Sequence, residues 1–333
     1  MTRTAHKTAA ASRAAALAAF AAVAGFSMVA APLALSAKPA VAAQEPDTAP
    51  ARDSRAAAIA LPAGMERVNG ALPAVAKLLE PIQGDAKEFG NGRIEDGEVL
   101  GWDFDKPGAP SSHAAAKQKL IAALRAAGYA YDEVGAIQKD NPAGPIRHFY
   151  ARSPKTGKRL LGYWIDAKTS QILVWARLAG GGAPQVAKAP ASLIGPTWRS
   201  TRISASTFWS QSGAYVGDGA QQATMITFNP DGTYKLHGYS QSRAGDWGLQ
   251  AYTWEEGKAS FDGDLVVLRP TGGKYKGVDT KLAHKNFERA MTADEMRANV
   301  RLYRWQMTDA DGKPVLKMGN GSSDQATFKP TNG

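Results

Sequence analysis

The chain has 333 residues, of which 44% are hydrophobic and 21% charged, and its formal net charge is +10. This balance excludes wholesale disorder, because it supplies enough apolar surface for a sizeable core, and the length allows two domains of ordinary size. Cysteine is absent, which excludes disulfide bonds, thiol nucleophiles and cysteine-ligated metal sites.

The first 42 residues have the pattern of a secretory signal peptide. Residues 1–43 contain no acidic side chain, and three basic residues precede an apolar stretch over residues 14–35. Small residues before and at Ala42 match the signal-peptidase rule, so we expect cleavage after Ala42. A transmembrane anchor is the alternative, since the stretch is nearly long enough to span a bilayer. A lipoprotein anchor is excluded, because it needs a cysteine at the cleavage site.

Cleavage changes what the net charge means. Removing residues 1–42 lowers the formal charge from +10 to +6, and a moderate charge on about 290 residues does not point to nucleic acid. Export without cysteine is typical of bacterial envelope proteins that depend on their core for stability. We therefore expect a periplasmic or secreted protein with no transmembrane segment after cleavage and no nucleic-acid partner.

The mature chain begins with two segments of different character. Residues 43–64 are rich in Ala, Pro, Asp and Arg without apolar periodicity, which predicts a disordered lead-in. Residues 65–178 are predicted to form a small α+β domain. Within it, a short helix is expected over residues 69–80, ending at Pro81, and a strand over residues 98–104.

The clearest pattern of this domain is a helix followed by strands. Ser112 as N-cap and Gly128 after the last turn predict a helix over residues 113–127. Three strands separated by turn sequences follow, at residues 146–152, 159–166 and 171–178. This order predicts a helix packed on one face of a three-stranded antiparallel sheet.

A Gly/Pro-rich linker, residues 179–192, separates this part from residues 193–333. There, turn sequences alternate with eight predicted strands at residues 197–203, 222–228, 233–240, 247–254, 258–261, 265–269, 300–308 and 315–318. A capping-box pattern from Thr292 to Glu295 predicts one short helix in the interruption between the last strands. These strands predict an antiparallel barrel or sandwich.

The run over residues 224–234 resembles a pattern of lipocalin-like bacterial envelope domains, in which a strand ending in Phe turns through Asp-Gly-Thr-Tyr into the next strand. Residues 195–198 look like the Gly-x-Trp opening of such barrels, and residues 263–268 look like one of their short closing strands. The resemblance covers about 120 residues of the C-terminal half and none of the N-terminal half. It implies a barrel with a cavity for a small apolar ligand, although related folds also serve as inhibitors or structural modules.

Motifs for metal binding and catalysis are not found. The mature chain has four histidines, at positions without ligand spacing, so we expect neither a metal nor a cofactor: His113, His148, His237 and His284. The segment 309–312 starts like a calcium loop but lacks the later ligands, which favours a hairpin turn. We therefore expect a non-enzymatic protein. A hydrolase with dispersed carboxylates stays open, because such pairs are distant in sequence.

Aromatic residues of the C-terminal half are candidates for ligand binding. Tyr252 and Trp254 share one face of a predicted strand, and Tyr239 has the same parity on a neighbouring strand. Together with Trp305 they are expected to line a pocket for a small apolar or amphiphilic ligand. Ordinary core packing is the alternative. Ligand binding inside a lipocalin-like barrel is the function that the sequence favours.

A second candidate surface is basic. Between residues 270 and 304, basic side chains outnumber acidic ones by four. The proposed contacts are Lys274, Lys276, Lys281, Lys285 and Arg289, which would meet lipopolysaccharide phosphate, an anionic lipid or an acidic polymer. A solvated excursion with charges of both signs is the alternative. The second predicted function is thus a cell-envelope module that binds an anionic component.

Overall fold

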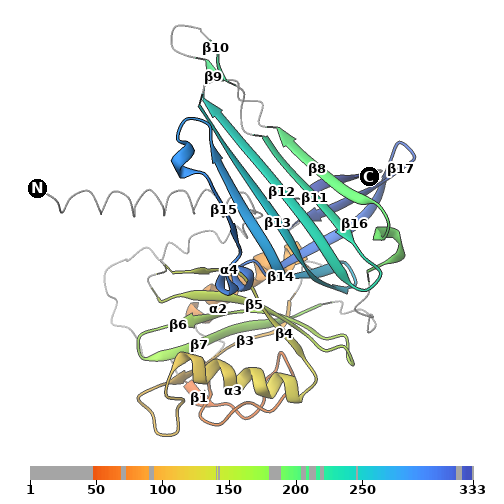
Figure 1. Cartoon of the computed structure of the whole chain (residues 1–333). Coiled ribbons are helices and arrows are strands. Elements are labelled where there is room, and N and C mark those ends of the chain that lie inside the picture. Colours follow the sequence, from red (N-terminus) through yellow and green to blue (C-terminus); the bar gives the residue numbers. More distant parts are fainter. Residues whose placement is uncertain are drawn as a thin grey trace, which may run out of the picture.

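The computed structural model describes residues 48–68, 73–89, 94–139, 141, 143–179, 189–203, 208–209, 215–217, 221–244, 247–319 and 325–331. These residues are mostly in strands, which form two large antiparallel sheets with few helices. Figure 1 shows the first sheet with its helices below and the long strands of the second sheet above. The predicted signal peptide and most of the predicted linker, residues 180–188, lie outside the described residues.

The first sheet has seven strands in the order β1-β2-β3-β7-β6-β5-β4. The three predicted strands are confirmed as β5 (Ile146–Arg152), β6 (Arg159–Asp166) and β7 (Ser170–Leu178). The expectation of a three-stranded sheet is wrong, because four further strands extend it: β1 (Thr48–Pro50), β2 (Glu66–Val68), β3 (Ile94–Asp103) and β4 (Ala130–Gln138). β3 pairs with β7, and β4 pairs with β5. The backbone groups on the outer edges of β5 and β7 therefore have hydrogen-bond partners.

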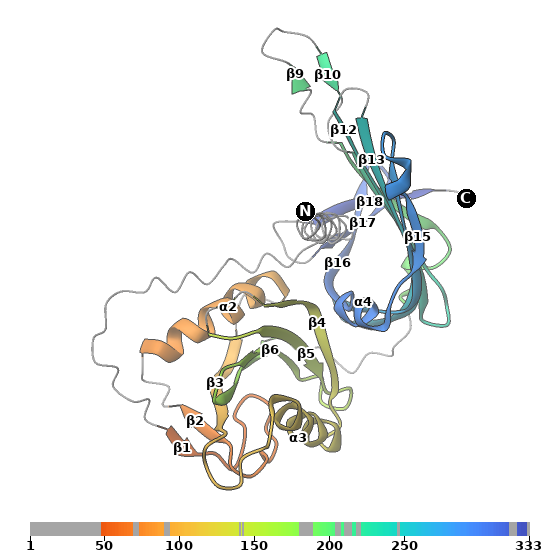
Figure 2. The same ribbon diagram turned by 60° about the vertical axis from the view of Figure 1, so that its left-hand side comes forward.

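Two helices cover opposite faces of this sheet, as Figure 2 shows. The predicted helix is confirmed as α3 (His113–Ala126), where the Ser112 side chain accepts a hydrogen bond from the Ala115 amide at 3.2 Å. α3 packs on a cluster that includes Trp164 and Trp175. α2 (Pro73–Phe89) packs on the opposite face, against Tyr163.

α2 does not end at Pro81 as predicted but continues to Phe89. A proline inside a helix removes one backbone hydrogen bond. Here Ile82, Ala86 and Phe89, all beyond the proline, are at most 1% exposed. Their burial on the sheet offsets the lost bond, at roughly 1.5–3 kcal/mol for each large apolar side chain.

The segment predicted as a disordered lead-in forms β1 from Thr48 and is packed from Ala51 onward. Buried alanines, including Ala56 and Ala57, join the cluster on the α3 face. The carboxylate of Glu98, only 3% exposed, holds the segment in place. It accepts hydrogen bonds from the Ser54 hydroxyl at 2.5 Å and the Ala56 amide at 3.1 Å. Composition predicted disorder because alanine has no strong periodic signal, whereas the buried carboxylate that orders the segment is 42 residues away.

Glu98 is itself fully compensated. Its other donors are the Trp175 indole at 2.9 Å and the Arg67 guanidinium, whose Nε lies 3.1 Å from Oε2. A buried charge with this many donors is tolerated in a low-dielectric interior.

The second sheet contains nine strands, all antiparallel. In chain order they are β8 (Thr197–Ile203), β11 (Gln221–Phe228), β12 (Thr233–Ala244), β13 (Trp247–Asp262), β14 (Leu265–Asp279), β15 (Phe287–Ala290), β16 (Arg301–Ala310), β17 (Lys313–Gly319) and β18 (Gln325–Thr331). The strand order is β13-β12-β11-β8-β18-β17-β16-β14-β15, and β13 also pairs with β14. Followed from β13 through to β14, the pairings therefore lead back to β13. A separate pair, β9 (Phe208–Trp209) and β10 (Tyr215–Gly217), lies beyond the upper end of these strands (Figure 1).

Two predicted interruptions of this sheet are wrong. The turn expected at residues 255–257 is a bulge between Glu256 and Gly257 inside the 16-residue β13. The excursion expected from residue 270 begins as the continuation of β14 to Asp279. After it come the 3-10 turn η2 (Ala283–Lys285), β15 and α4 (Ala293–Ala298). The predicted capping box of α4 is confirmed, with Thr292 and Glu295 bonded reciprocally.

The two sheets share buried contacts. Leu265, Val267 and Leu302, on β14 and β16, belong to the same apolar cluster as α2 and the first sheet. Polar contacts flank this cluster, since the Tyr150 hydroxyl donates to Asp262 at 2.6 Å and Arg269 forms a bidentate ion pair with Asp132.

Candidate functional site

One face of the second sheet, which we call the inner face, carries a packed apolar cluster. Its large members are buried: Trp198, Phe228, Tyr234, Phe261, Tyr303 and Phe328. The Phe261 ring contacts Phe228 at 5.4 Å and Trp305 at 5.8 Å between centroids. Of the four predicted ligand-binding aromatics, Trp305 alone packs against this cluster.

A buried ion pair between Glu255 on β13 and Arg301 on β16 lies next to this cluster on the inner face. The Glu255 side chain is fully buried and pairs with the Arg301 guanidinium, which is 8% exposed. The Tyr234 hydroxyl donates to the same carboxylate at 2.5 Å. Burial, together with the negative charge of Glu255, raises the pKa of Tyr234, so the hydroxyl stays a donor.

Three predicted aromatics lie on the opposite, outer face. Glu255 points inward and pairs with Leu236 across β12, so the next residue, Trp254, points outward beside His237. Tyr252 and Tyr239 pair with each other and share this parity. These three residues therefore do not share the inner face with Trp305. Alternation predicts which residues share a face, but the distant contact with Arg301 decides which face is inner.

The outer aromatics form a continuous ladder, which we call the aromatic face: Tyr239, Tyr252 and Trp254. The Tyr239 and Tyr252 centroids are 5.1 Å apart, and the Tyr252 and Trp254 centroids are 5.7 Å apart with an angle of 11° between ring planes. The Tyr252 hydroxyl donates to Gln250 at 3.1 Å, and the Tyr239 hydroxyl donates to Gln241. All three rings are half-buried, so the ladder is held in place while part of its surface meets solvent.

Lysines from the neighbouring strand join the aromatic face. Lys274 pairs with Trp254 and Lys276 with Tyr252 across β13 and β14. The Lys274 Nζ lies 4.7 Å from the Trp254 ring centroid, within cation–π range, and 2.7 Å from Glu288 Oε1. The hydrogen bond from Lys274 lowers the pKa of Glu288. The structure thus brings members of the two predicted binding sets together on one surface.

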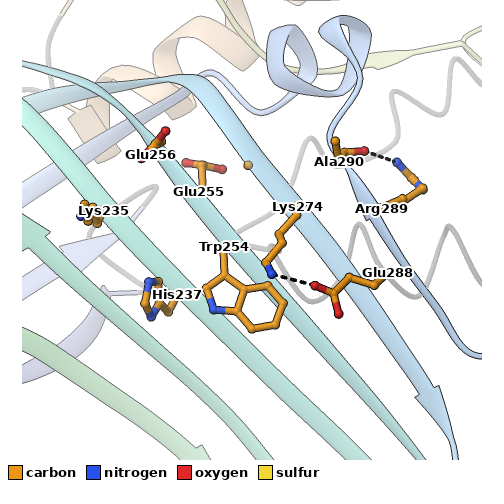
Figure 3. Close-up of a pocket in the computed structure, with 10 residues that line it drawn as sticks. Lys235, His237, Trp254, Glu255, Glu256, Lys274, Glu288, Arg289 and Ala290 are labelled. Carbon is orange, nitrogen blue, oxygen red and sulfur yellow. Dashed lines mark hydrogen bonds and ion pairs between the residues drawn. The ribbon is translucent and has the colours of Figure 1, made fainter.

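A pocket of about 630 Å³ adjoins this surface at Trp254 and Lys274 and does not include Tyr239, Tyr252 or Lys276. Its lining residues are Lys235, His237, Trp254, Glu255, Glu256, Gly273, Lys274, Glu288, Arg289 and Ala290. Figure 3 shows the Trp254 ring nearly face on over the strands, between His237 and Lys274. Burial and the charge of Lys235 lower the pKa of His237, so its imidazole is neutral at pH 7 and can donate and accept hydrogen bonds.

The remaining predicted basic residues lie away from the aromatic face, although Arg289 also lines the pocket. Arg289 lies over the Tyr275 ring at 5.3 Å and forms a bidentate pair with Glu295, at 2.7 and 2.8 Å. Lys281 and Lys285 are exposed between β14 and β15. Of the five, Lys274 and Arg289 line the same pocket.

The binding residues predicted from the sequence do not include Lys235, His237, Glu256 or Glu288. A usable signal existed for the first two, because residues 235, 237 and 239 alternate along one strand and must share a face. Glu256 and Glu288 could not be found in this way, since their positions depend on the bulge in β13 and on the pairing of β15.

The pocket carboxylates already have basic partners in two cases, Glu255 with Arg301 and Glu288 with Lys274. Within the described parts of the chain, no three potential metal ligands cluster. The predicted turn at residues 309–312 is confirmed, with positive φ at Asp311 and Gly312. Among the described helices, none combines the length and apolar character needed to cross a bilayer.

Comparison with known proteins adds no assignment. The sequence matches no protein-family model, and no curated protein matches it significantly.

Proposed function

We propose that the chain is an exported, non-enzymatic binding protein that holds an acidic saccharide on its aromatic face. The observation that carries this proposal is the Tyr252–Trp254 pair, nearly parallel at 5.7 Å, with the Lys274 ammonium 4.7 Å from the indole centroid. For the fold, we propose a lipocalin-like barrel, which the ring of strand pairings supports.

A sugar ring has an apolar face of C–H groups and a rim of hydroxyls. Partly exposed aromatic rings bury the apolar face while the hydroxyls stay hydrated or bonded to nearby polar groups. His237, Gln241 and Gln250 supply such groups around the ladder. The ladder spans two strands, which fits a ligand of several sugar units better than a single ring.

The two lysines favour an acidic sugar. Lys274 and Lys276 share a single carboxylate, Glu288, at 2.7 and 3.7 Å. An incoming carboxylate or sulfate can therefore pair with Lys276 without leaving Glu288 unpaired. Such exposed pairs contribute modestly, on the order of 1 kcal/mol or less, so stacking supplies most of the affinity.

The small apolar ligand expected from the sequence has less support. Three of its four proposed contacts lie on the outer face, and the inner face beside Trp305 is closely packed by aromatic side chains. The sugar-binding proposal uses the same three residues on the surface where they lie.

Affinity measurements with polygalacturonate, dextran and oleate test the proposal. We expect saturable binding of the acidic polymer, weaker binding of neutral dextran, and weakening as salt rises. Trp254→Ala should weaken polygalacturonate binding at least tenfold, which is about 1.4 kcal/mol. Phe287→Ala is the matched control, since Phe287 is an exposed aromatic residue outside the pocket.

Two outcomes contradict the proposal. One is polygalacturonate binding that Trp254→Ala leaves unchanged although the variant melts like the wild type. The other is oleate binding that is lost on Trp305→Ala and kept in Trp254→Ala, which would favour an interior carrier site.

A further inference from the structure

Exposed apolar side chains gather at one end of the second sheet. Among the described residues, the large hydrophobic side chains with the greatest exposure are Leu249 at 39%, Leu282 at 37% and Phe287 at 36%. Leu249 pairs with Asp279 at the end of β14, and Phe287 pairs with Gly277 on the other side of that strand. Leu282 follows three residues after Asp279. We call Leu249 and residues 279–287 the distal tip.

Hydrogen bonds give the distal tip a fixed shape. The Asp279 carboxylate, in a residue that is 7% exposed, accepts from the amides of Lys281 at 3.0 Å and Leu282 at 2.9 Å. The Asn286 side chain accepts from the Asp279 amide at 2.7 Å. The turn that exposes Leu282 is therefore ordered by hydrogen bonds.

A second set of contacts ties the turn to β13. The Thr280 amide donates to the Gly248 carbonyl at 3.0 Å, and the Gly248 amide donates to the Thr280 hydroxyl at 2.7 Å. The Phe287 ring lies over Gly277, where a Cβ would come within 2.5 Å of it. Leu249, Leu282 and Phe287 therefore lie on three segments that strand pairing and these hydrogen bonds hold side by side.

The charge around these side chains is positive. Lys281 and Lys285 are exposed in the tip, and Asp279, which caps the turn, is the acidic residue within it, so the tip carries a net positive charge. The neighbouring Glu288 pairs with Lys274 at 2.7 Å. An apolar cluster with a basic surround complements an anionic lipid surface, where apolar groups enter the interface and lysines meet the headgroups.

The position of the tip suits contact with a flat surface. The first sheet packs on β14 near Val267, and Asp279 lies 12 residues along the same strand, roughly 40 Å away at 3.3 Å per residue. Figures 1 and 2 show this end of the second sheet pointing away from the first sheet and its helices. The strands β9 and β10 lie beyond this end of the sheet (Figure 1).

We propose that the distal tip docks on the surface of a bilayer that contains anionic phospholipid. Leu249, Leu282 and Phe287 enter the interfacial layer, and Lys281 and Lys285 face the headgroups. This site is separate from the aromatic face and does not depend on the saccharide proposal. Together the two sites would hold a saccharide close to a membrane.

Flotation with lipid vesicles tests this proposal on the purified full chain. Vesicles of phosphatidylglycerol and phosphatidylethanolamine in equal parts should float the wild type, and vesicles of phosphatidylcholine alone should float it at least tenfold less. The double variant Leu282→Ser, Phe287→Ser should reduce flotation with the anionic vesicles at least tenfold. Lys281→Gln, Lys285→Gln should reduce it several-fold and remove most of its salt dependence.

Trp254→Ala is the control, because it removes an aromatic side chain from the other site, and it should float like the wild type. A second readout does not need the serine variants to fold: the added indole of Leu282→Trp should blue-shift its emission when anionic vesicles are added. The proposal is overturned if the wild type does not float with anionic vesicles. It is equally overturned if the tip variants float as well as the wild type, or if flotation depends on Trp254.

Discussion

His148, on β5, shows how one largely buried side chain sets a pH dependence. Its ring lies 5.6 Å from the Tyr163 ring, and its Nδ1 lies 3.8 Å from the Asp85 carboxylate on α2. Burial lowers the pKa of His148 from 6.5 to about 4. The loss of hydration, which lowers the pKa, thus outweighs the attraction of the Asp85 carboxylate, which lies beyond hydrogen-bond distance and would raise it.

The folded pKa is below the unfolded one, so the unfolded chain binds the proton more readily between pH 6.5 and about 4. The free energy of unfolding therefore falls as the pH falls through this window. His148→Gln should remove a loss of roughly 2 kcal/mol between pH 7 and pH 4.5, measured by urea unfolding at both values. His284→Gln, at an exposed site, should keep the wild-type pH dependence. An unchanged dependence in His148→Gln would contradict the assignment.

The glycine of the β13 bulge decides the geometry of the element that carries the aromatic face. A Cβ on Gly257 would lie 2.0 Å from the Arg269 carbonyl oxygen on β14, so the two backbones approach too closely for any side chain. Gly257→Ala should lower the free energy of unfolding by about 3 kcal/mol or more, because the backbone must move.

Gly312 provides the comparison for this prediction. It has a φ of 74° in the β16–β17 turn and open space around a Cβ, so Gly312→Ala should cost only about 1 kcal/mol. Urea unfolding of both variants is the measurement. Equal losses would contradict the assignment, because they would show that the close approach at Gly257 adds nothing to the cost of a side chain.

The same bulge explains the limit of sequence-based prediction for the elements. Local chemistry was enough for α3, for the capping box of α4 and for the strands from Ile146 to Leu178. Glu-Glu-Gly at residues 255–257 is compatible with a turn or a bulge, and the pairing with Arg269 and Pro270 decides between them. For the candidate site, the sequence grouped Tyr239, Tyr252 and Trp254 correctly, whereas their face depended on contacts distant in sequence.

At the scale of the whole molecule, the apolar contact between the sheets had a sequence signal that the strand interpretation did not use. Residues 265–268 read Leu-Val-Val-Leu, and a strand that is apolar at every position is buried on both faces. Val266 and Leu268 join the inner cluster of the second sheet, while Leu265 and Val267 join the cluster with α2 and the first sheet. A linker composition between the two parts therefore says nothing about whether their surfaces pack together.

This shared cluster predicts that the two sheets unfold together. Leu265, Val267 and Leu302 are at most 2% exposed, and leaving them in water on separation would cost several kcal/mol, at about 1.5–3 kcal/mol each. Differential scanning calorimetry of the wild type should give a single transition, and the double variant Val267→Ala, Leu302→Ala should broaden it or split it in two. The double variant Val266→Ala, Leu316→Ala removes the same side-chain atoms from the inner cluster alone, so it should lower the melting temperature while keeping one transition. Two transitions in the wild type, or one sharp transition in the double variant, would show that the cluster does not couple the sheets.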